Sequence, residues 1–252
     1  MVSPRIIPVL LLKGEGLVKG IKFKNHRYLG DPINAVKIFN DKEVDELIFL
    51  DINANKEGRT ISPELVDKLS TECYMPFSIG GGIRNIEQIK MLLGLGAEKV
   101  IINTEAVNNP NIIKEASEIF GSQSVVISVD VKKSIFGIYN VFTYSGIRKE
   151  EIKLTEYLKK IEEYGAGEIM INSIDKDGTM TGYDIDLIKI VKSILKIPLI
   201  ASGGAGEFKH FKEAFLEAKV SAVAAGSMFV FIGKKRGILI NYPDKDELKN
   251  IF

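Results

Sequence analysis

One glycine-rich pattern occurs twice in this chain of 252 residues, about half a chain length apart. Residues 78–83 (SIGGGI) and 201–206 (ASGGAG) each follow a short apolar run, and Gly81 and Gly204 are 123 residues apart. Other matching segments are 124 residues apart: Asp51 corresponds to Asp175, and Asn103 to Ser227. This repetition predicts two similar half-barrels, about 1–121 and 122–252, within one closed barrel.

One position breaks the repeat. An apolar strand is expected to end at Asp130, and the corresponding strand of the first half ends near residue 11. Leu11 stands there, within the segment PVLLLKG (8–14). We therefore predict a scaffold that keeps two glycine turns but has lost one of two opposed carboxylates.

Short β-branched runs alternate with longer amphipathic segments along the chain, which is typical of βα units around a parallel sheet. A length of 252 residues suits one (β/α)8 TIM barrel, and no linker indicates a second domain within 1–252. The predicted strands are 5–12, 46–51, 77–79, 99–103, 124–130, 168–172, 199–202 and 222–226. The predicted helices are 32–41, 63–72, 86–95, 110–120, 151–164, 185–195, 208–217 and one after Pro243.

Composition excludes several classes of function. A net charge of +1, from 34 basic and 33 acidic residues, gives no general attraction to nucleic acid or membrane. No apolar run approaches the ~20 residues of a membrane span, and no signal peptide begins the chain, so we expect a cytoplasmic protein. Two histidines and the single Cys73 make a zinc site improbable, and we expect no metal or cofactor. Cys73 itself reads as a small apolar residue at the end of a helix.

Two connections are expected to lie on the C-terminal face of the barrel, where such enzymes place their chemistry. Residues 13–30 are rich in glycine and lysine, and we expect this segment to be a loop that acts as a lid. Residues 132–144 alternate like a hairpin that follows the fifth strand.

The glycine turns suit phosphate, because a glycine-rich turn between a strand and a helix exposes backbone N–H groups to an anion. Gly82 and Gly204 each precede, by one strand, a small or hydroxyl cluster, which is Asn103 and Thr104 in one half and Gly226 and Ser227 in the other. The pattern predicts two phosphate sites on opposite sides of one mouth and an elongated ligand with an anionic group at each end. Turns needed only for folding are the alternative.

Asp130 is the candidate general acid or base, since its carboxylate ends an apolar strand and should project into the mouth. It could instead cap the next loop. Asp51 and Asp177 end other strands and could orient donors or hold loop backbone, although Asp177 with Gly178 also reads as a plain turn.

Four charged residues lie at the first position of their predicted strands. They are Arg5, Glu46, Lys99 and Glu168. They should meet at the N-terminal end of the barrel and could neutralise one another as a plug or gate. Spacing alone favours the alternative, a set of solvated charges.

These residues together resemble the cyclase subunit family of imidazole glycerol phosphate synthase, from Arg5 to Phe231. The matching segments are 5–8 (RIIP), 18–20 (VKG), 30–32 (GDP), 45–52 (DELIFLDI), 80–83 (GGGI), 120–123 (FGSQ), 175–179 (DKDGT) and 201–206 (ASGGAG). The resemblance implies a partner glutaminase on the N-terminal barrel face. Ammonia from this partner passes through the barrel to a bis-phosphorylated ribosyl substrate at the C-terminal face, and the reaction is that of a carbon–nitrogen lyase in histidine biosynthesis.

The resemblance also assigns residues. It places the ammonia gate on Arg5, Glu46, Lys99 and Glu168, and the phosphate sites on Gly82, Asn103, Thr104, Gly178, Gly204, Gly226 and Ser227. Further substrate or loop positions fall on Lys19, Asp51, Asp177 and Ser202. The catalytic pair falls on Asp130 and, where the family has its second aspartate, on Leu11.

Other departures accompany Leu11. The loop reads KGEG at 13–16 where the family has Asp-Gly-Arg after the lysine, Asn172 replaces a threonine, and Val230 replaces a histidine. The segment PVLLLKG at 8–14, together with KFKN at 22–25, resembles a paralogous branch that works with a glutaminase and a sugar amidotransferase to convert acetamido to acetamidino groups for surface polysaccharides.

Three functions therefore remain open. The chain is expected to be an ammonia-handling subunit of a sugar-modifying amidotransferase. The first alternative is an authentic cyclase that uses Asp130 alone or with a substitute carboxylate such as Glu15. The second alternative is a non-catalytic module that activates its glutaminase allosterically.

Overall fold

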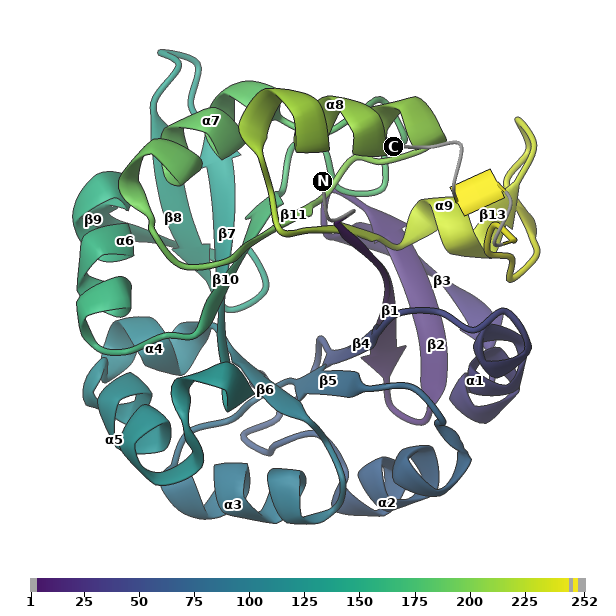
Figure 1. Cartoon of the computed structure of the whole chain (residues 1–252), viewed down its shortest axis with the longest axis horizontal. Helices are drawn as coiled ribbons and strands as arrows, with labels where there is room; N and C mark the ends of the chain where they lie inside the picture. The colour runs from purple at the N-terminus through teal and green to yellow at the C-terminus, as the bar shows by residue number, and fades with distance from the viewer. Residues whose placement is uncertain (1–3, 245–246, 249–252) are drawn as a thin grey trace.

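Eight parallel strands pair in a closed ring in the computed structural model, which describes residues 4–244 and 247–248 (Figure 1). They are β1 (Arg5–Lys13), β4 (Leu47–Asp51), β5 (Phe77–Gly80), β6 (Lys99–Ile102), β7 (Val125–Lys133), β10 (Glu168–Ser173), β11 (Leu199–Ser202) and β12 (Ala222–Ala225). β1 pairs with both β12 and β4, and β7 pairs with β10, so the ring has no free edge. The predicted (β/α)8 barrel is confirmed.

Amphipathic helices surround this ring (Figure 1). They are α1 (Pro32–Asp41), α2 (Pro63–Glu72), α3 (Ile86–Gly94), α5 (Asn111–Phe120), α6 (Leu154–Glu163), α7 (Ile185–Ile194) and α8 (Phe208–Ala218). Capping side chains fix several starts: Asp31 accepts hydrogen bonds from the N–H groups of Ile33 and Asn34 at α1, and Asp184 accepts from Leu187 N–H at α7. The helix predicted after Pro243 lies mostly outside the described residues.

Residues 13–30 form a hairpin, so the prediction of a loop over this segment is wrong, while its role as a lid stays a prediction. β2 (Gly16–Ile21) pairs antiparallel with the end of β1, and β3 (Lys24–Gly30) pairs with β2. The glycines and lysines of this segment read as a loop. However, buried Leu17, Val18 and Leu29 fix the hairpin against the barrel, because backbone pairing with β1 is a long-range interaction that local composition does not reveal.

The segment after β7 holds one strand more than expected. The predicted hairpin is present as β7 and β8 (Tyr139–Thr143), but β9 (Arg148–Lys153) pairs with β8 where the start of a helix at residue 151 was predicted. Its charged sequence RKEEIK favours a helix locally. Antiparallel pairing and the hydrogen bond from Thr143 Oγ1 to Glu150 override that preference.

The core has two separate parts. A large cluster fills the space between the sheet and its helices, and a smaller one fills the barrel interior. The interior cluster consists of Ile7, Val9, Ile48, Ile101, Val126, Met170, Ile200, Ala222 and Ala224, with Leu11 and Leu50 packed against it. Within the described residues, no helix has both the length and the apolar character needed to cross a membrane.

Candidate functional site

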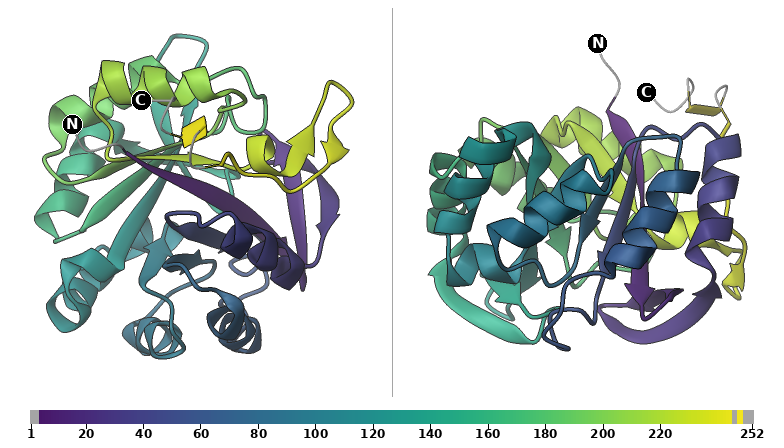
Figure 2. Two further views of the ribbon diagram at one scale, coloured as in Figure 1. Left: turned by 45° about the vertical axis from the view of Figure 1, so that its right-hand side comes forward. Right: turned by 90° about the horizontal axis from the view of Figure 1, so that it is seen from below.

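A cavity of about 920 Å³ opens where the parallel strands end, and every position assigned to the catalytic, phosphate or substrate sites lines it. Those residues are Leu11, Lys19, Asp51, Gly82, Asn103, Thr104, Asp130, Asp177, Gly178, Ser202, Gly204, Gly226 and Ser227. Figure 2, right, shows the purple and teal hairpins on this side of the barrel, opposite the start of β1. The fold thus brings together residues that are up to 216 positions apart in the chain.

Close backbone approach requires the glycines of both turns. Gly82 has φ +66°, and a Cβ there would lie 1.9 Å from the carbonyl oxygen of Arg59. Gly204 has φ +122°, and a Cβ there would lie 2.1 Å from the carbonyl oxygen of Gly182. No side chain fits either position, so both turns present bare backbone to the cavity.

The side-chain hydroxyls of the two predicted phosphate sites differ in the hydrogen bonds that they make with the protein. Thr104 Oγ1 accepts a hydrogen bond from Asn55 Nδ2 at 3.0 Å and from Tyr144 N at 3.1 Å. Ser227 Oγ is buried without a hydrogen-bond partner among the described residues. The Thr104 hydroxyl is therefore already held by other protein groups, while the Ser227 hydroxyl remains available.

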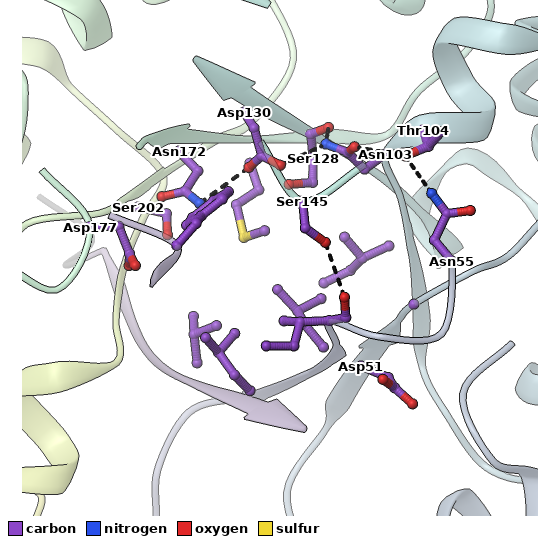
Figure 3. A pocket seen from close by; sticks show the side chains of 18 of the residues that line it. Asp51, Asn55, Asn103, Thr104, Ser128, Asp130, Ser145, Asn172, Asp177 and Ser202 are labelled. Carbon is purple, nitrogen blue, oxygen red and sulfur yellow. Dashed lines mark hydrogen bonds between the residues drawn. The ribbon is translucent and has the colours of Figure 1, made fainter. Parts of the chain in front are cut away.

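Asp130 is buried in the wall of the cavity between two amides (Figure 3). Asn172 Nδ2 donates to its Oδ1 and Asn103 Nδ2 donates to its Oδ2, each at 3.2 Å. Burial raises the pKa of the Asp130 carboxyl from 3.8 to about 7, although the Asn172 hydrogen bond acts to lower it; the negative charge of Asp177 adds to the rise. A carboxyl that titrates near neutral pH can act as a general acid or base.

Leu11 lines the same cavity, and its hydrocarbon side chain can neither donate nor accept a proton. Its half-buried side chain packs with Leu50 against the interior cluster, which makes this part of the floor apolar. Glu15, the proposed substitute carboxylate, is exposed in the turn between β1 and β2 and is not part of the cavity lining.

Asp51 and Asp177 both hold other protein groups. The Asp51 carboxylate accepts hydrogen bonds from the N–H groups of Asn53 and Ala54, and its other oxygen lies 2.6 Å from Arg59 Nη1. Asp177 forms a buried ion pair with Lys19 at 2.7 Å. Asp51 therefore holds the backbone of its own loop, which is one of the two roles that the sequence left open. Asp177 instead binds Lys19 of the hairpin β2–β3.

The four strand-start charges form a closed ring of ion pairs at the other end of the barrel. Arg5 contacts both Glu46 and Glu168, and Lys99 Nζ lies 3.1 Å from Glu46 and 3.3 Å from Glu168. Ser78 Oγ also donates to Glu46 at 2.7 Å. Both glutamates are more than nine-tenths buried, so the reading as solvated charges is wrong.

Four side chains that no sequence pattern indicated as site residues cover the cavity. Phe23 and His26 come from the hairpin β2–β3, and Tyr144 and Ser145 come from the turn between β8 and β9. The two turns meet, because a Cβ on Gly146 would lie 2.9 Å from the Phe23 ring. Burial, with Lys19 and Lys13 nearby, lowers the pKa of His26. Only the pairing of β9, hidden by its helix-like composition, places this turn over the mouth.

Cys73 is not among the residues that line the cavity. Cys73 ends α2 as predicted, half-buried against the core, and burial raises the pKa of its thiol to about 11. Among the described residues, no three His, Cys, Asp or Glu side chains lie close enough together to hold a metal ion.

Comparisons with known proteins identify the family of this chain. Residues 5–234 match the family model described as "Histidine biosynthesis protein". The chain is 47% identical over 253 residues to "Putative imidazole glycerol phosphate synthase subunit HisF" of Leptospira borgpetersenii, covering 100% of both chains.

Two further relatives also carry the name of a HisF subunit. "Putative imidazole glycerol phosphate synthase subunit hisF2" of Pseudomonas aeruginosa is 48% identical over 98% of this chain and 99% of its own. "Imidazole glycerol phosphate synthase subunit HisF" of Methanocaldococcus jannaschii is 44% identical over 88% of this chain and 89% of its own. The chain belongs to the HisF family of imidazole glycerol phosphate synthase subunits.

Proposed function

We propose that this chain is the barrel subunit of a glutamine-dependent amidotransferase and receives ammonia from a partner glutaminase. Three features support the proposal: family membership, the charged ring at the N-terminal end, and the apolar interior that leads from that ring to the cavity. In this proposal the glutaminase docks on the N-terminal face, and the ring of Arg5, Glu46, Lys99 and Glu168 is the gate through which ammonia enters.

The acceptor of the ammonia differs from that of the standard cyclase, and Leu11 carries this inference. A leucine can neither donate nor accept a proton, and one general acid or base typically contributes ~10²- to 10⁴-fold to a rate. Ring closure that uses two opposed carboxylates is therefore severely impaired here. The chain serves the acetamidino modification of a surface-polysaccharide sugar, and a separate sugar amidotransferase completes the reaction.

Turnover of purified protein with the bis-phosphorylated ribosyl substrate and saturating ammonium tests this proposal, because supplied ammonium bypasses the glutaminase. We expect no cyclisation above about one hundredth of the rate of an authentic cyclase subunit. Robust conversion would refute the redirected acceptor. Stimulation of the glutaminase without any ammonia-dependent sugar amidination would indicate that the chain is a non-catalytic allosteric activator.

An authentic cyclase of histidine biosynthesis, a carbon–nitrogen lyase subunit, is the second candidate. Both glycine turns are intact and the Ser227 hydroxyl has no hydrogen-bond partner in the part of the chain that the structure describes, which favours a ligand with two phosphates. Against it, Glu15 is outside the cavity lining, so Asp130 would have to work alone.

A further inference from the structure

Three hairpins at the cavity mouth concentrate positive charge in a chain whose net charge is only +1. These mouth hairpins are residues 13–30 with β2 and β3, residues 132–153 with β8 and β9, and residues 231–239 with β13 (Phe231–Ile232) and β14 (Gly237–Ile238). Together they hold 13 basic and 3 acidic residues, whereas the remainder of the chain holds 21 basic and 30 acidic residues. The C-terminal face is therefore positive on a protein that is otherwise acidic.

All three mouth hairpins adjoin the cavity opening. Phe23 of the first hairpin and Arg148 of the second line the cavity. The third hairpin is attached through Arg236, which donates to the carbonyl oxygen of Gly178, another lining residue, at 2.7 Å. Arg27 Nη1 of the first hairpin donates to the Arg236 carbonyl oxygen at 2.9 Å, so the first and third hairpins lie side by side (Figure 2, left). The three hairpins thus form one rim.

Most charges of this rim have no counter-charge within the protein. Lys19, Arg148 and Lys153 form ion pairs, whereas the other ten cations of the mouth hairpins form none in the part of the chain that the structure describes. Nine of these ten side chains are exposed. Like charges gathered on one face raise its local potential, so an acidic surface would be attracted to this rim.

Exposed apolar side chains are concentrated on the same hairpins. The mouth hairpins make up 49 of the 252 residues, yet they carry nine of the fifteen large apolar side chains that are exposed among the described residues. These nine are Ile21, Tyr28, Ile135, Phe136, Ile138, Ile147, Ile232, Ile238 and Leu239. Exposed apolar groups set among charged ones are typical of a surface that binds another protein.

A protein fits this surface better than a nucleic acid or a lipid bilayer does. Seven of the nine apolar side chains are aliphatic, and an aliphatic side chain offers no ring on which a base can stack. A bilayer would cover a mouth lined by carboxylates such as Asp130 and Asp177, which lipid cannot hydrogen-bond. A folded protein can place carboxylates against the cations and apolar side chains against the isoleucines.

We propose that the mouth hairpins are the docking surface for the enzyme that accepts the ammonia, and that this enzyme presents an acidic surface with apolar side chains among its carboxylates. The inference rests on the proposed function, in which ammonia leaves the barrel at this face. A partner seated on all three hairpins covers the mouth and keeps ammonia from escaping to solvent. Docking there leaves the N-terminal face free for the glutaminase.

Fluorescence anisotropy of the labelled full chain, titrated with the purified sugar amidotransferase of the same organism, tests the charged part of the surface. Lys22→Glu combined with Lys235→Glu reverses one exposed cation on each of two mouth hairpins. The matched control, Lys68→Glu combined with Lys90→Glu, makes the same change in charge on exposed side chains of α2 and α3. We expect Kd to rise about tenfold or more in the mouth variant and about twofold or less in the control.

A second pair of variants tests the apolar part. Ile147 is 76% exposed at the mouth, and Leu216 is 55% exposed on α8, away from the mouth hairpins. We expect Ile147→Ser to raise Kd about fivefold and Leu216→Ser to leave it unchanged. Equal effects of the mouth and control variants in both pairs, or no binding by the parent chain, would overturn the docking surface.

Vesicles of phosphatidylcholine with phosphatidylglycerol are the probe for the alternative occupant. We expect no sedimentation of the chain with these vesicles at the salt concentration where it binds the amidotransferase. Sedimentation that is abolished by Lys22→Glu with Lys235→Glu, without binding to the amidotransferase, would identify a membrane site and overturn the proposal.

Failure of the docking surface is distinguishable from failure of the proposed function. Sugar amidination that requires this chain but is unaffected by the mouth variants overturns only the docking surface. Amidination that proceeds at full rate without this chain, although the amidotransferase binds the mouth hairpins as expected, overturns only the proposed function.

Discussion

Replacing Glu46 by glutamine should reveal how much the charged ring stabilises the barrel. Glu46 is 3% exposed and accepts from Arg5, Lys99 and Ser78. The neutral amide leaves two cations facing Glu168 alone. Removing one partner of a buried ion pair costs about 3–5 kcal/mol, and the low end applies because Arg5 is 33% exposed and both cations keep Glu168. We expect a loss of about 3 kcal/mol in the free energy of unfolding.

Scanning calorimetry measures this loss. For a chain of this size about 3 kcal/mol lowers Tm by about 6–12 °C. The matched control is Glu217→Gln, which breaks a 2.6 Å ion pair with Lys189 between half-exposed side chains and should cost at most about 0.5 kcal/mol. Adding Lys99→Met to Glu46→Gln should recover about 1 kcal/mol, because it removes an underpaired buried cation. Equal losses in Glu46→Gln and Glu217→Gln would refute the reasoning.

Three further predictions concern the cavity. The pKa of Asp130 is raised in the folded state, so folding favours its protonated form. Its contribution to the free energy of unfolding is therefore fully present below about pH 4 and is lost as pH rises through about 7. Asp130→Asn should therefore be more stable than the parent by about 2 kcal/mol in urea unfolding at pH 8.5. This gain should shrink towards pH 5. A gain that does not change with pH would contradict the burial argument. Gly204→Ala should cost more than about 2 kcal/mol, because its Cβ meets a carbonyl oxygen at 2.1 Å, whereas Gly137→Ala, with φ +81° and open space, should cost about 1 kcal/mol in the same assay. Leu11→Asp should not fully restore cyclisation, because the hairpin β2–β3 and Val230 also differ from the standard cyclase, and turnover at the rate of an authentic subunit would show that one carboxylate suffices.

The sequence was most informative where local periodicity and chain position agree. Leu199–Ser202 and the helices α1 and α2 have the predicted bounds, because an apolar run or an amphipathic repeat there begins and ends at clear Pro or capping signals. The same rule placed Asp130 and Asn103 at the mouth, since parallel strands end at one edge of a barrel.

Pairing between distant strands could not be predicted in the same way. The sequence predicts a loop where the hairpin β2–β3 lies and the start of a helix at residues 151–153 of β9, because backbone hydrogen bonds to a partner strand depend on where the chain returns. The roof over the cavity, including Phe23 and Tyr144, depends on both of these strands.

The sequence by itself determined that this chain forms a barrel with two glycine turns and that leucine replaces a carboxylate at position 11, because these are properties of residue identity and order. Only the tertiary structure decided that the strand-start charges pair with one another, that Asp51 holds the backbone of its own loop, and that Asn172 and Asn103 both donate to Asp130. Each of these is a question of which polar groups satisfy each other once water is excluded, and the partners lie far apart in the chain.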